Sequence, residues 1–98
     1  MAIAPSKRGE SWLARNIAVE YGRNNIRANC ISPGLIKTDF SRTLWENEAI
    51  LKSATNGSAL KRIGMPDEIA GVAVMLASEA GSYINGQTIV VDGGTTIS

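Results

Sequence analysis

The chain has 98 residues, 44% of them hydrophobic, and ten basic and nine acidic residues give it a formal net charge of +1. This length allows one small domain, and the balanced, interspersed charge argues against a dedicated nucleic-acid surface. No apolar run is long enough to cross a membrane. A single cysteine without histidine gives neither an internal disulfide nor a zinc site, and Cys30 is expected to be a small core residue. Because no leader sequence opens the chain, we expect a cytoplasmic protein.

The first predicted element is a helix that begins near Ser6, after five mostly apolar residues, and ends at Gly22. Trp12, Leu13 and Ile17 recur at helical spacing and define its apolar face. Glycine is common directly after a helix, which favours an end at this position.

An apolar run over residues 26–31 predicts a strand buried on both faces, as in a parallel sheet. The strand is expected to stop at Ser32-Pro33-Gly34, because proline has no N–H for the ladder and glycine adopts backbone angles closed to other residues. Ligands bind at the carboxyl ends of the strands in open α/β sheets. We therefore expect the backbone of Leu35 and Ile36 and the hydroxyl of Thr38 to face a ligand.

The second half predicts an irregular helical segment, a regular helix and a last strand. Over residues 40–60, Phe40, Leu44 and Trp45 are expected to form an apolar patch, which favours a surface helical hairpin held by Trp45. The next helix opens at Pro66, and its apolar stripe is Ile69, Val72, Ala73 and Leu76. A β-branched strand follows over residues 87–91. The helix between two strands predicts a parallel, right-handed βαβ unit.

Three stretches resemble the short-chain dehydrogenases/reductases. Residues 27–38, Arg-Ala-Asn-Cys-Ile-Ser-Pro-Gly-Leu-Ile-Lys-Thr, look like the family's sixth strand and Pro-Gly loop. Residues 62–70 resemble its late helix and residues 86–94 its last strand. The resemblance covers nearly all of the chain but only the back part of the family's domain. It implies an α/β fold, with residues 1–98 forming one partial domain: the C-terminal part of a Rossmann-type doubly wound parallel sheet, in the order helix, strand, helical lid, helix, strand.

The resemblance also implies an NAD or NADP cofactor and roles for the loop after the strand. In the family this loop, here Pro33, Gly34, Leu35, Ile36 and Thr38, covers the nicotinamide. The backbone at the Ile36 position hydrogen-bonds the carboxamide, and the hydroxyl at the Thr38 position contacts the carboxamide or the pyrophosphate. Residues 40–60 correspond to the segment over the substrate, so they are also interpreted as a substrate lid, which is compatible with a surface hairpin. Residues 35–45 look most like the carbonyl-reductase-type members.

The catalytic helix of the family carries Tyr-x-x-x-Lys, and Lys7 matches the lysine. There the tyrosine is the general acid/base, and the lysine, one helical turn on, lowers the tyrosine pKa and holds the ribose hydroxyls. The tyrosine position is residue 3, which is Ile3 in this chain. Lys7 is either a cofactor-binding lysine or an ordinary solvated lysine at a helix start. These 98 residues also contain no glycine-rich pyrophosphate turn, so we expect this chain alone to be inactive and to bind the cofactor poorly.

Two functions remain open from the sequence. The first is the C-terminal segment of an NAD(P)-dependent oxidoreductase that moves a hydride between the nicotinamide and the carbonyl or alcohol carbon of a small molecule. The second is a non-catalytic, degenerate segment that acts as an oligomerisation or interaction module. A sheet of two strands would leave an edge of the strand 26–31 unpaired, and with it an apolar helix face. We therefore expect a homo-oligomer, or a complex with a chain that carries the missing N-terminal half.

Overall fold

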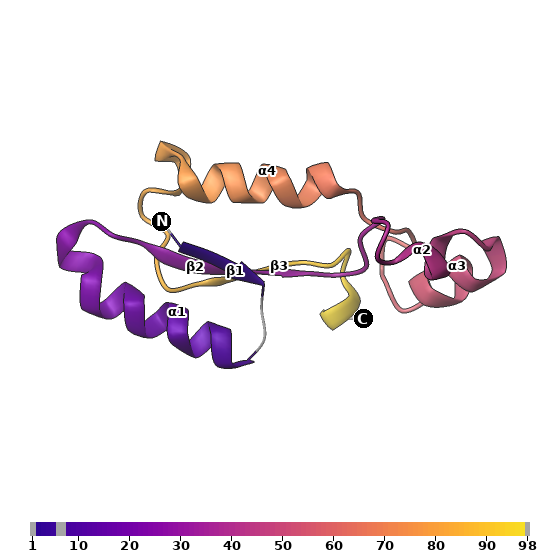
Figure 1. Cartoon of the computed structure of the whole chain (residues 1–98), viewed down its shortest axis with the longest axis horizontal. Coiled ribbons are helices and arrows are strands. Elements are labelled where there is room, and N and C mark those ends of the chain that lie inside the picture. The colour runs from indigo at the N-terminus through magenta and orange to yellow at the C-terminus, as the bar shows by residue number, and fades with distance from the viewer. Residues whose placement is uncertain (1, 6–7, 98) are drawn as a thin grey trace.

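The computed structural model describes residues 2–5 and 8–97, which form an elongated molecule of 50 × 24 × 23 Å. Three parallel strands in the order β1-β2-β3 lie between two helices (Figure 1). The strands are β1 (Ala2–Pro5), β2 (Ala28–Pro33) and β3 (Thr88–Val91), and the long helices are α1 (Arg8–Tyr21) and α4 (Pro66–Ala77). The short helices α2 (Arg42–Trp45) and α3 (Glu48–Thr55) project at one end, and 3-10 turns occupy Gly22–Asn24, Glu79–Gly81 and Thr95–Ile97. The α/β class predicted from the sequence is confirmed.

Strand β1 was not predicted. It pairs with β2 in parallel, with Ala2 opposite Ala28 and Pro5 opposite Ile31. The expectation of a two-stranded sheet with a bare edge on β2 is therefore wrong, because β1 covers that edge. Four residues are too few to show a period of two, and the alignment with a catalytic helix favoured a helical residue 3. Ile3 instead lies in β1, and the predicted helix start at Ser6 lies outside the described residues.

Strand β2 is buried on both faces, as predicted, over residues 28–31. Ala28 and Cys30 pack in one cluster with Ala14 and Ala18 of α1. The boundaries differ from the prediction. Ile26 lies outside the strand and is 44% exposed, whereas the ladder continues to Pro33, since Gly34 N donates to the carbonyl of Val91 at 2.9 Å. A proline at the last strand position does not interrupt the ladder, because the next residue provides the donor.

Two asparagine side chains join β2 to the segment that enters β3. Asn29 is fully buried; its Nδ2 donates to the carbonyl of Ile84 at 3.0 Å and its Oδ1 accepts from Gln87 N at 2.9 Å. Asn85 Oδ1 accepts from Ala28 N at 3.1 Å. These bonds satisfy polar groups inside the core and fix where β3 starts relative to β2.

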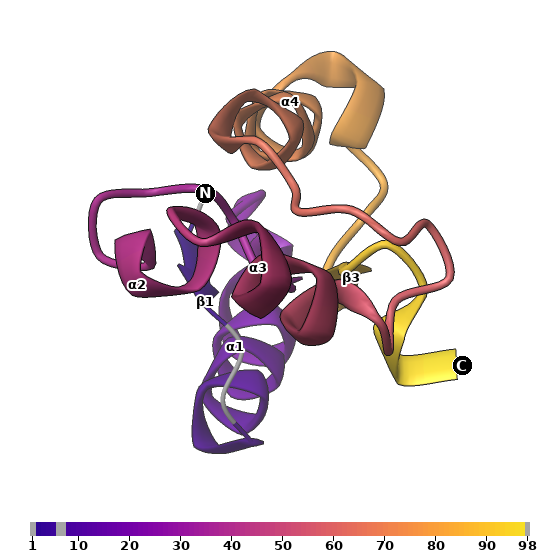
Figure 2. The ribbon, with the colours of Figure 1, turned by 90° about the vertical axis from the view of Figure 1, so that its right-hand side faces the viewer.

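Helix α4 packs on the sheet face opposite α1 (Figures 1 and 2). Its predicted apolar stripe is confirmed, with Leu76 fully buried. The strands of the βαβ unit are parallel, as predicted, but the prediction of a right-handed crossover connection is wrong. With the strands in the order β1-β2-β3 and the helices on opposite faces, the two crossovers have opposite hands, and the one through α4 is left-handed. The right-handed rule holds where a strand leads directly into the helix that packs back on its sheet, and here residues 34–65 intervene.

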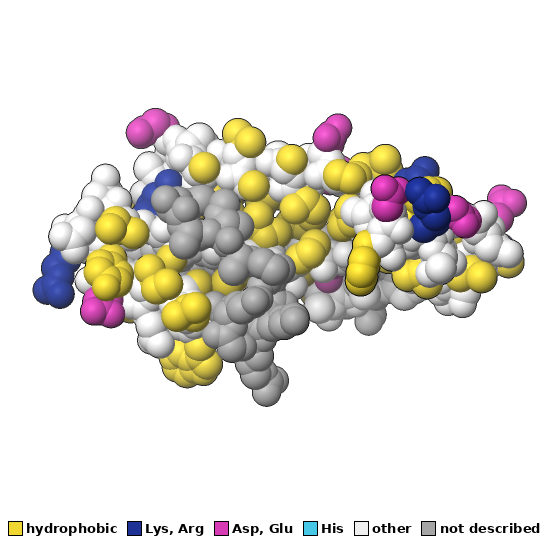
Figure 3. Space-filling view, in the orientation of Figure 1, with side chains coloured by type: hydrophobic (Ala, Val, Ile, Leu, Met, Phe, Trp, Pro, Cys, Tyr) yellow, Lys and Arg dark blue, Asp and Glu magenta, His cyan; other side chains and the backbone are white. Residues whose placement is uncertain are grey.

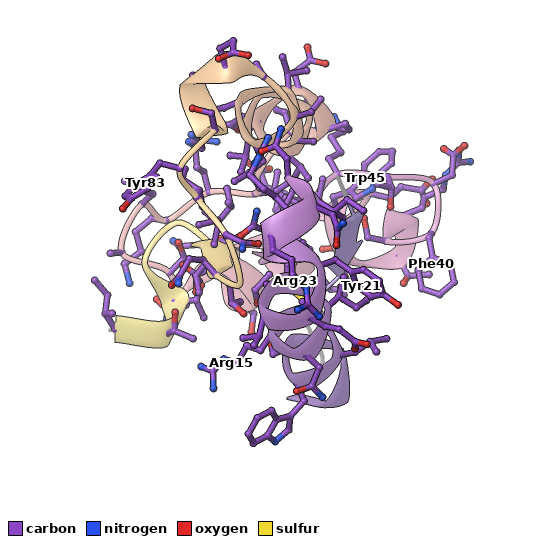
Figure 4. All side chains as sticks on the ribbon, turned by 90° about the vertical axis from the view of Figure 1, so that its left-hand side faces the viewer. Arg15, Tyr21, Arg23, Phe40, Trp45 and Tyr83 are labelled. Carbon is purple, nitrogen blue, oxygen red and sulfur yellow. The ribbon has the colours of Figure 1, made fainter. Side chains whose placement is uncertain are left out.

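The α2-α3 arm, residues 37–63, is attached to the sheet at its two ends. An isolated parallel bridge joins Ile36 to Gly64 where the arm begins and ends. Ser58 Oγ also donates to the carbonyl of Gly93 at 2.9 Å, after β3. Phe40 does not join the predicted patch with Leu44 and Trp45, because its side chain is fully exposed and points outward (Figure 4).

Helix α1 buries one face and exposes another that is also apolar. Ile17 packs against the core cluster, so the expectation that its side chain needs a partner from another chain is wrong. Trp12 and Leu13 are 62% and 59% exposed, and Val19 is more exposed still. Hydrophobic side chains are visible over α1 and beneath α4 in Figure 3. Among the described residues, no helix is long and apolar enough to cross a membrane.

Candidate cofactor loop at the end of β2

The chain leaves the sheet at the carboxyl end of β2, at Gly34. Glycine is required here by a close approach to the segment after β3. A Cβ at residue 34 would lie 2.8 Å from Cα and 2.9 Å from Cβ of Asp92. Gly34 does not have a positive φ. The sequence predicted a glycine here for its unusual backbone angles, and that reason is wrong. The glycine instead lets the loop and the end of β3 lie side by side.

Two backbone hydrogen bonds hold the next residues against the far end of the arm. Gly64 N donates to the carbonyl of Leu35, and Lys37 N donates to the carbonyl of Gly64, both at 2.9 Å. A Cβ at residue 64 would lie 2.7 Å from Cδ1 of Ile36. The loop backbone is therefore fixed on this side by a glycine nearly thirty residues away along the chain.

The Ser41 hydroxyl lies at the centre of the hydrogen bonds around Thr38. Ser41 Oγ lies 2.6 Å from the carbonyl of Ile36, to which it donates, and it accepts from Thr38 N at 3.0 Å. In turn Ser41 N donates to Thr38 Oγ1 at 3.3 Å. The Ile36 carbonyl and the Thr38 hydroxyl, two of the predicted ligand-facing groups, thus share one internal partner.

Trp45 joins helix α2 to the same turn. Its Nε1 donates to the carbonyl of Thr38 at 2.8 Å, and Lys37 Nζ lies over its ring, 4.7 Å from the centroid. Arg42 lies on the ring at 5.9 Å and pairs with Asp39 at 2.8 Å. The cationic side chains over an indole face stabilise this arrangement. These contacts join α2 to polar groups of the loop and none of them reaches α3, so the idea that Trp45 holds the hairpin stays a prediction.

A cavity of about 120 Å³ lies between this loop, α3 and the segment after β3. Leu35, Thr55 and Asp92 are among its lining residues. At its border, Arg62 donates through both terminal nitrogens to Glu68, at 2.7 and 2.8 Å. The Arg62 bonds, with a further bond from Met65 N, lower the pKa of Glu68 to about 2, and the same pair raises the pKa of Arg62.

Asp92 orders the chain after β3. Its carboxylate accepts from Gly94 N and Thr96 N, both at 2.9 Å, and from the Thr96 hydroxyl. These bonds, those from Thr96 first, lower the pKa of Asp92. Because Asp92 lies directly beside Gly34, the turn after β3 packs against the loop.

The predicted site residues Pro33, Gly34, Leu35, Ile36 and Thr38 lie at the end of β2 and in the loop that follows it. Lys7 lies outside the described residues. Sequence reasoning missed Ser41, Gly64 and Asp92. The spacing Thr38-x-x-Ser41 is typical of a hydroxyl-bonded turn and was available as a signal. Gly64 and Asp92 approach the loop only through tertiary structure, so no local pattern marks them.

Comparison with known proteins places this loop in a family. A family model described as enoyl-(acyl carrier protein) reductase matches residues 1–96. "Dehydrogenase/reductase SDR family member 4" of Bos taurus is 48% identical over 90 residues, which are 92% of this chain and 32% of that protein. The chain belongs to the short-chain dehydrogenase/reductase family. It spans about a third of the length of the curated relatives it matches.

Solved structures of this family have the same arrangement. A 4-hydroxyisoleucine dehydrogenase complexed with NADH matches with a TM-score of 0.85 and 33% identity, over 90% of this chain and 36% of that one. A putative 2-deoxy-D-gluconate 3-dehydrogenase from Agrobacterium tumefaciens with bound NADP matches with a TM-score of 0.85 and 33% identity, over 92% of this chain and 37% of that one. The chain is therefore an oxidoreductase-family segment with a partial Rossmann fold, in a family that uses NAD or NADP.

Proposed function

We propose that this chain supplies the nicotinamide-binding loop of an NAD(P)-dependent oxidoreductase that acts on a small carbonyl or alcohol substrate. One observation carries the proposal. The loop of Pro33, Gly34, Leu35, Ile36 and Thr38 leaves the carboxyl end of β2, where open α/β sheets bind ligands, in a chain of this family. The nicotinamide, when bound, provides or accepts the hydride.

The donor and acceptor groups of the loop fit a carboxamide. The Ile36 carbonyl is an acceptor for an amide N–H, and the Thr38 hydroxyl both donates and accepts. Thr38 is exposed and Ile36 half-buried, so a ligand can reach both. Gly34 and Gly64 hold the backbone of this loop in place, which lowers the ordering cost of binding.

Other parts of the proposal concern groups outside this loop. Lys7 is proposed to hold the ribose hydroxyls, and with Ile3 at the tyrosine position this chain alone carries no general acid/base there. Residues 40–60 of the arm are proposed to lie over the substrate. A second copy of the chain, or a chain with the N-terminal part of a family domain, is proposed to complete the site.

Light scattering combined with NADH and NADPH fluorescence tests the proposal. We expect a discrete oligomer, and a saturable rise in fluorescence that is stronger once a polypeptide with the N-terminal part of a family domain is added. Thr38→Val should weaken the response, because it removes the hydroxyl. Thr43→Val is the matched control, because Thr43 is an exposed residue of the neighbouring helix. Equal responses of the two variants would refute the role of Thr38.

The second candidate function, a non-catalytic interaction module, is favoured by the exposed apolar side chains of α1. Trp12, Leu13 and Val19 lie exposed on one helix, as they would at an interface. Cofactor fluorescence, measured with the added N-terminal polypeptide, separates the candidates. A saturable signal supports the oxidoreductase segment, and stable assembly without cofactor fluorescence supports the module.

A further inference from the structure

The Ser41 hydroxyl holds the two loop groups that the proposed function assigns to the carboxamide. It donates to the Ile36 carbonyl at 2.6 Å, and it lies 3.3 Å from Thr38 Oγ1. A hydroxyl has one hydrogen, so the Ile36 carbonyl, its shortest partner, is where that hydrogen is used. We propose that Ser41 is an internal competitor of the nicotinamide carboxamide: in the free loop it occupies the Ile36 carbonyl, and binding replaces its O–H by an amide N–H.

This inference rests on the proposed function and adds a positioning residue to it. Ser41 stands directly before helix α2, where a serine usually caps the first turn. Here its side chain makes no capping bond to α2, because the hydroxyl is turned toward the loop. Helix α2 therefore does not depend on the bond that binding would break.

The surroundings of Ser41 make the exchange a local event. Ser41 is half-buried and Thr38 exposed, so water and ligand reach the bonds between them. The loop backbone is held independently by Gly64, through its bonds to Leu35 and Lys37. Removing the Ser41 hydroxyl should thus free the Ile36 carbonyl while residues 35–37 keep their course. It also removes the acceptor of Thr38 N, so the structure of the turn has to be checked in the variant.

Trp45 provides a spectroscopic probe of the same turn. Its indole N–H donates to the carbonyl of Thr38 at 2.8 Å, so the indole signal reports any displacement of Thr38. Trp12, the second tryptophan, lies on α1 and is 62% exposed. The Trp12 indole signal is therefore an internal reference in the same spectrum.

The test is a titration of the ¹⁵N-labelled chain with nicotinamide, followed by the amide signal of Thr38 and the indole signal of Trp45. We expect Ser41→Ala to bind nicotinamide roughly fivefold more tightly than the unchanged chain, the factor that corresponds to one net hydrogen bond. Ser41→Thr, which keeps the hydroxyl, and Ser53→Ala, an exposed serine on α3, should bind as the unchanged chain does. Nicotinic acid, whose carboxylate has no N–H to donate, should gain nothing from Ser41→Ala.

The outcomes separate this inference from the function on which it rests. If the unchanged chain responds and Ser41→Ala binds equally or more weakly, Ser41 only supports the loop, and the inference fails while the proposed function stands. The titration is repeated with the polypeptide that carries the N-terminal part of a family domain; if neither variant responds to nicotinamide in that mixture, both the inference and the proposed function fail. An intact Trp45 indole signal in Ser41→Ala verifies that the turn has kept its structure.

Discussion

Gly34→Ala should destabilise the protein by overpacking the contact between the loop and the end of β3. The added Cβ would lie 2.8 Å from Asp92 Cα and 2.9 Å from its Cβ, closer than carbon atoms approach. Neither neighbour is the flexible end of a side chain, so backbone has to move. Overpacking of this kind costs about 1–3 kcal/mol. The displacement also strains the bond from Gly34 N to the carbonyl of Val91, which closes the β2-β3 ladder.

Gly71→Ala is the matched control, because a Cβ at residue 71 meets no atom within 4 Å and the position lies inside α4. Alanine favours a helix over glycine by about 1 kcal/mol, so this change should stabilise the chain. Urea unfolding followed by circular dichroism, at one fixed chain concentration, measures both free energies of unfolding. A Gly34→Ala variant as stable as the unchanged chain would mean that the loop yields at this contact and does not rest on Asp92.

Three further changes test the core and the charges. Leu76→Ala removes the fully buried side chain of α4 and should lower the free energy of unfolding by about 2–5 kcal/mol, measured in urea; a loss below 1 kcal/mol would contradict the packing of α4 on the sheet. Asn85→Ala leaves the Ala28 amide without its acceptor, so it should lower the free energy of unfolding by about 1–3 kcal/mol and speed hydrogen exchange of that amide. Asn24→Ala, at an exposed position, should change neither the stability nor the exchange rate. The pKa of Glu68 in the folded chain, about 2, lies below its unfolded value of 4.5. The ion pair with Arg62 therefore stabilises the fold fully above pH 4.5, and this stabilisation is lost as the pH falls through 2. An NMR titration of the Glu68 carboxyl with a midpoint near pH 4.5 would refute the bidentate pair.

The sequence predicted those elements that carry their own local signal. The helix that opens at Pro66 begins where a proline and two acids favour a first turn, and its stripe ends in the buried Leu76. Strand β2 was predicted because residues 26–31 form an apolar run that only Arg27 and Asn29 interrupt, and residues 28–31 are buried. In the loop, Pro33 and Gly34 mark the end of β2, which located the candidate site.

The remaining features depend on contacts between distant segments. Strand β1 forms by pairing with the edge of β2. Its four residues are too few to show a periodicity, so the sequence did not predict it. The left-handed crossover follows from the path of residues 34–65, which leave the sheet before α4 returns to it. Gly34 was assigned the wrong reason, because its neighbour Asp92 comes from the far end of the chain.

The loop that is proposed to contact the cofactor is also the attachment of the arm. The arm is joined to the loop at its beginning, by Trp45 and Ser41, and at its end, by Gly64. A movement of residues 40–60 relative to the loop would break the bonds from Trp45 to the Thr38 carbonyl and from Ser41 to the Ile36 carbonyl, or carry these carbonyls along. If residues 40–60 are a substrate lid, closure of the lid and release of the Ile36 carbonyl by Ser41 would be one event. Substrate binding and carboxamide binding would then favour each other, by the same factor in either order.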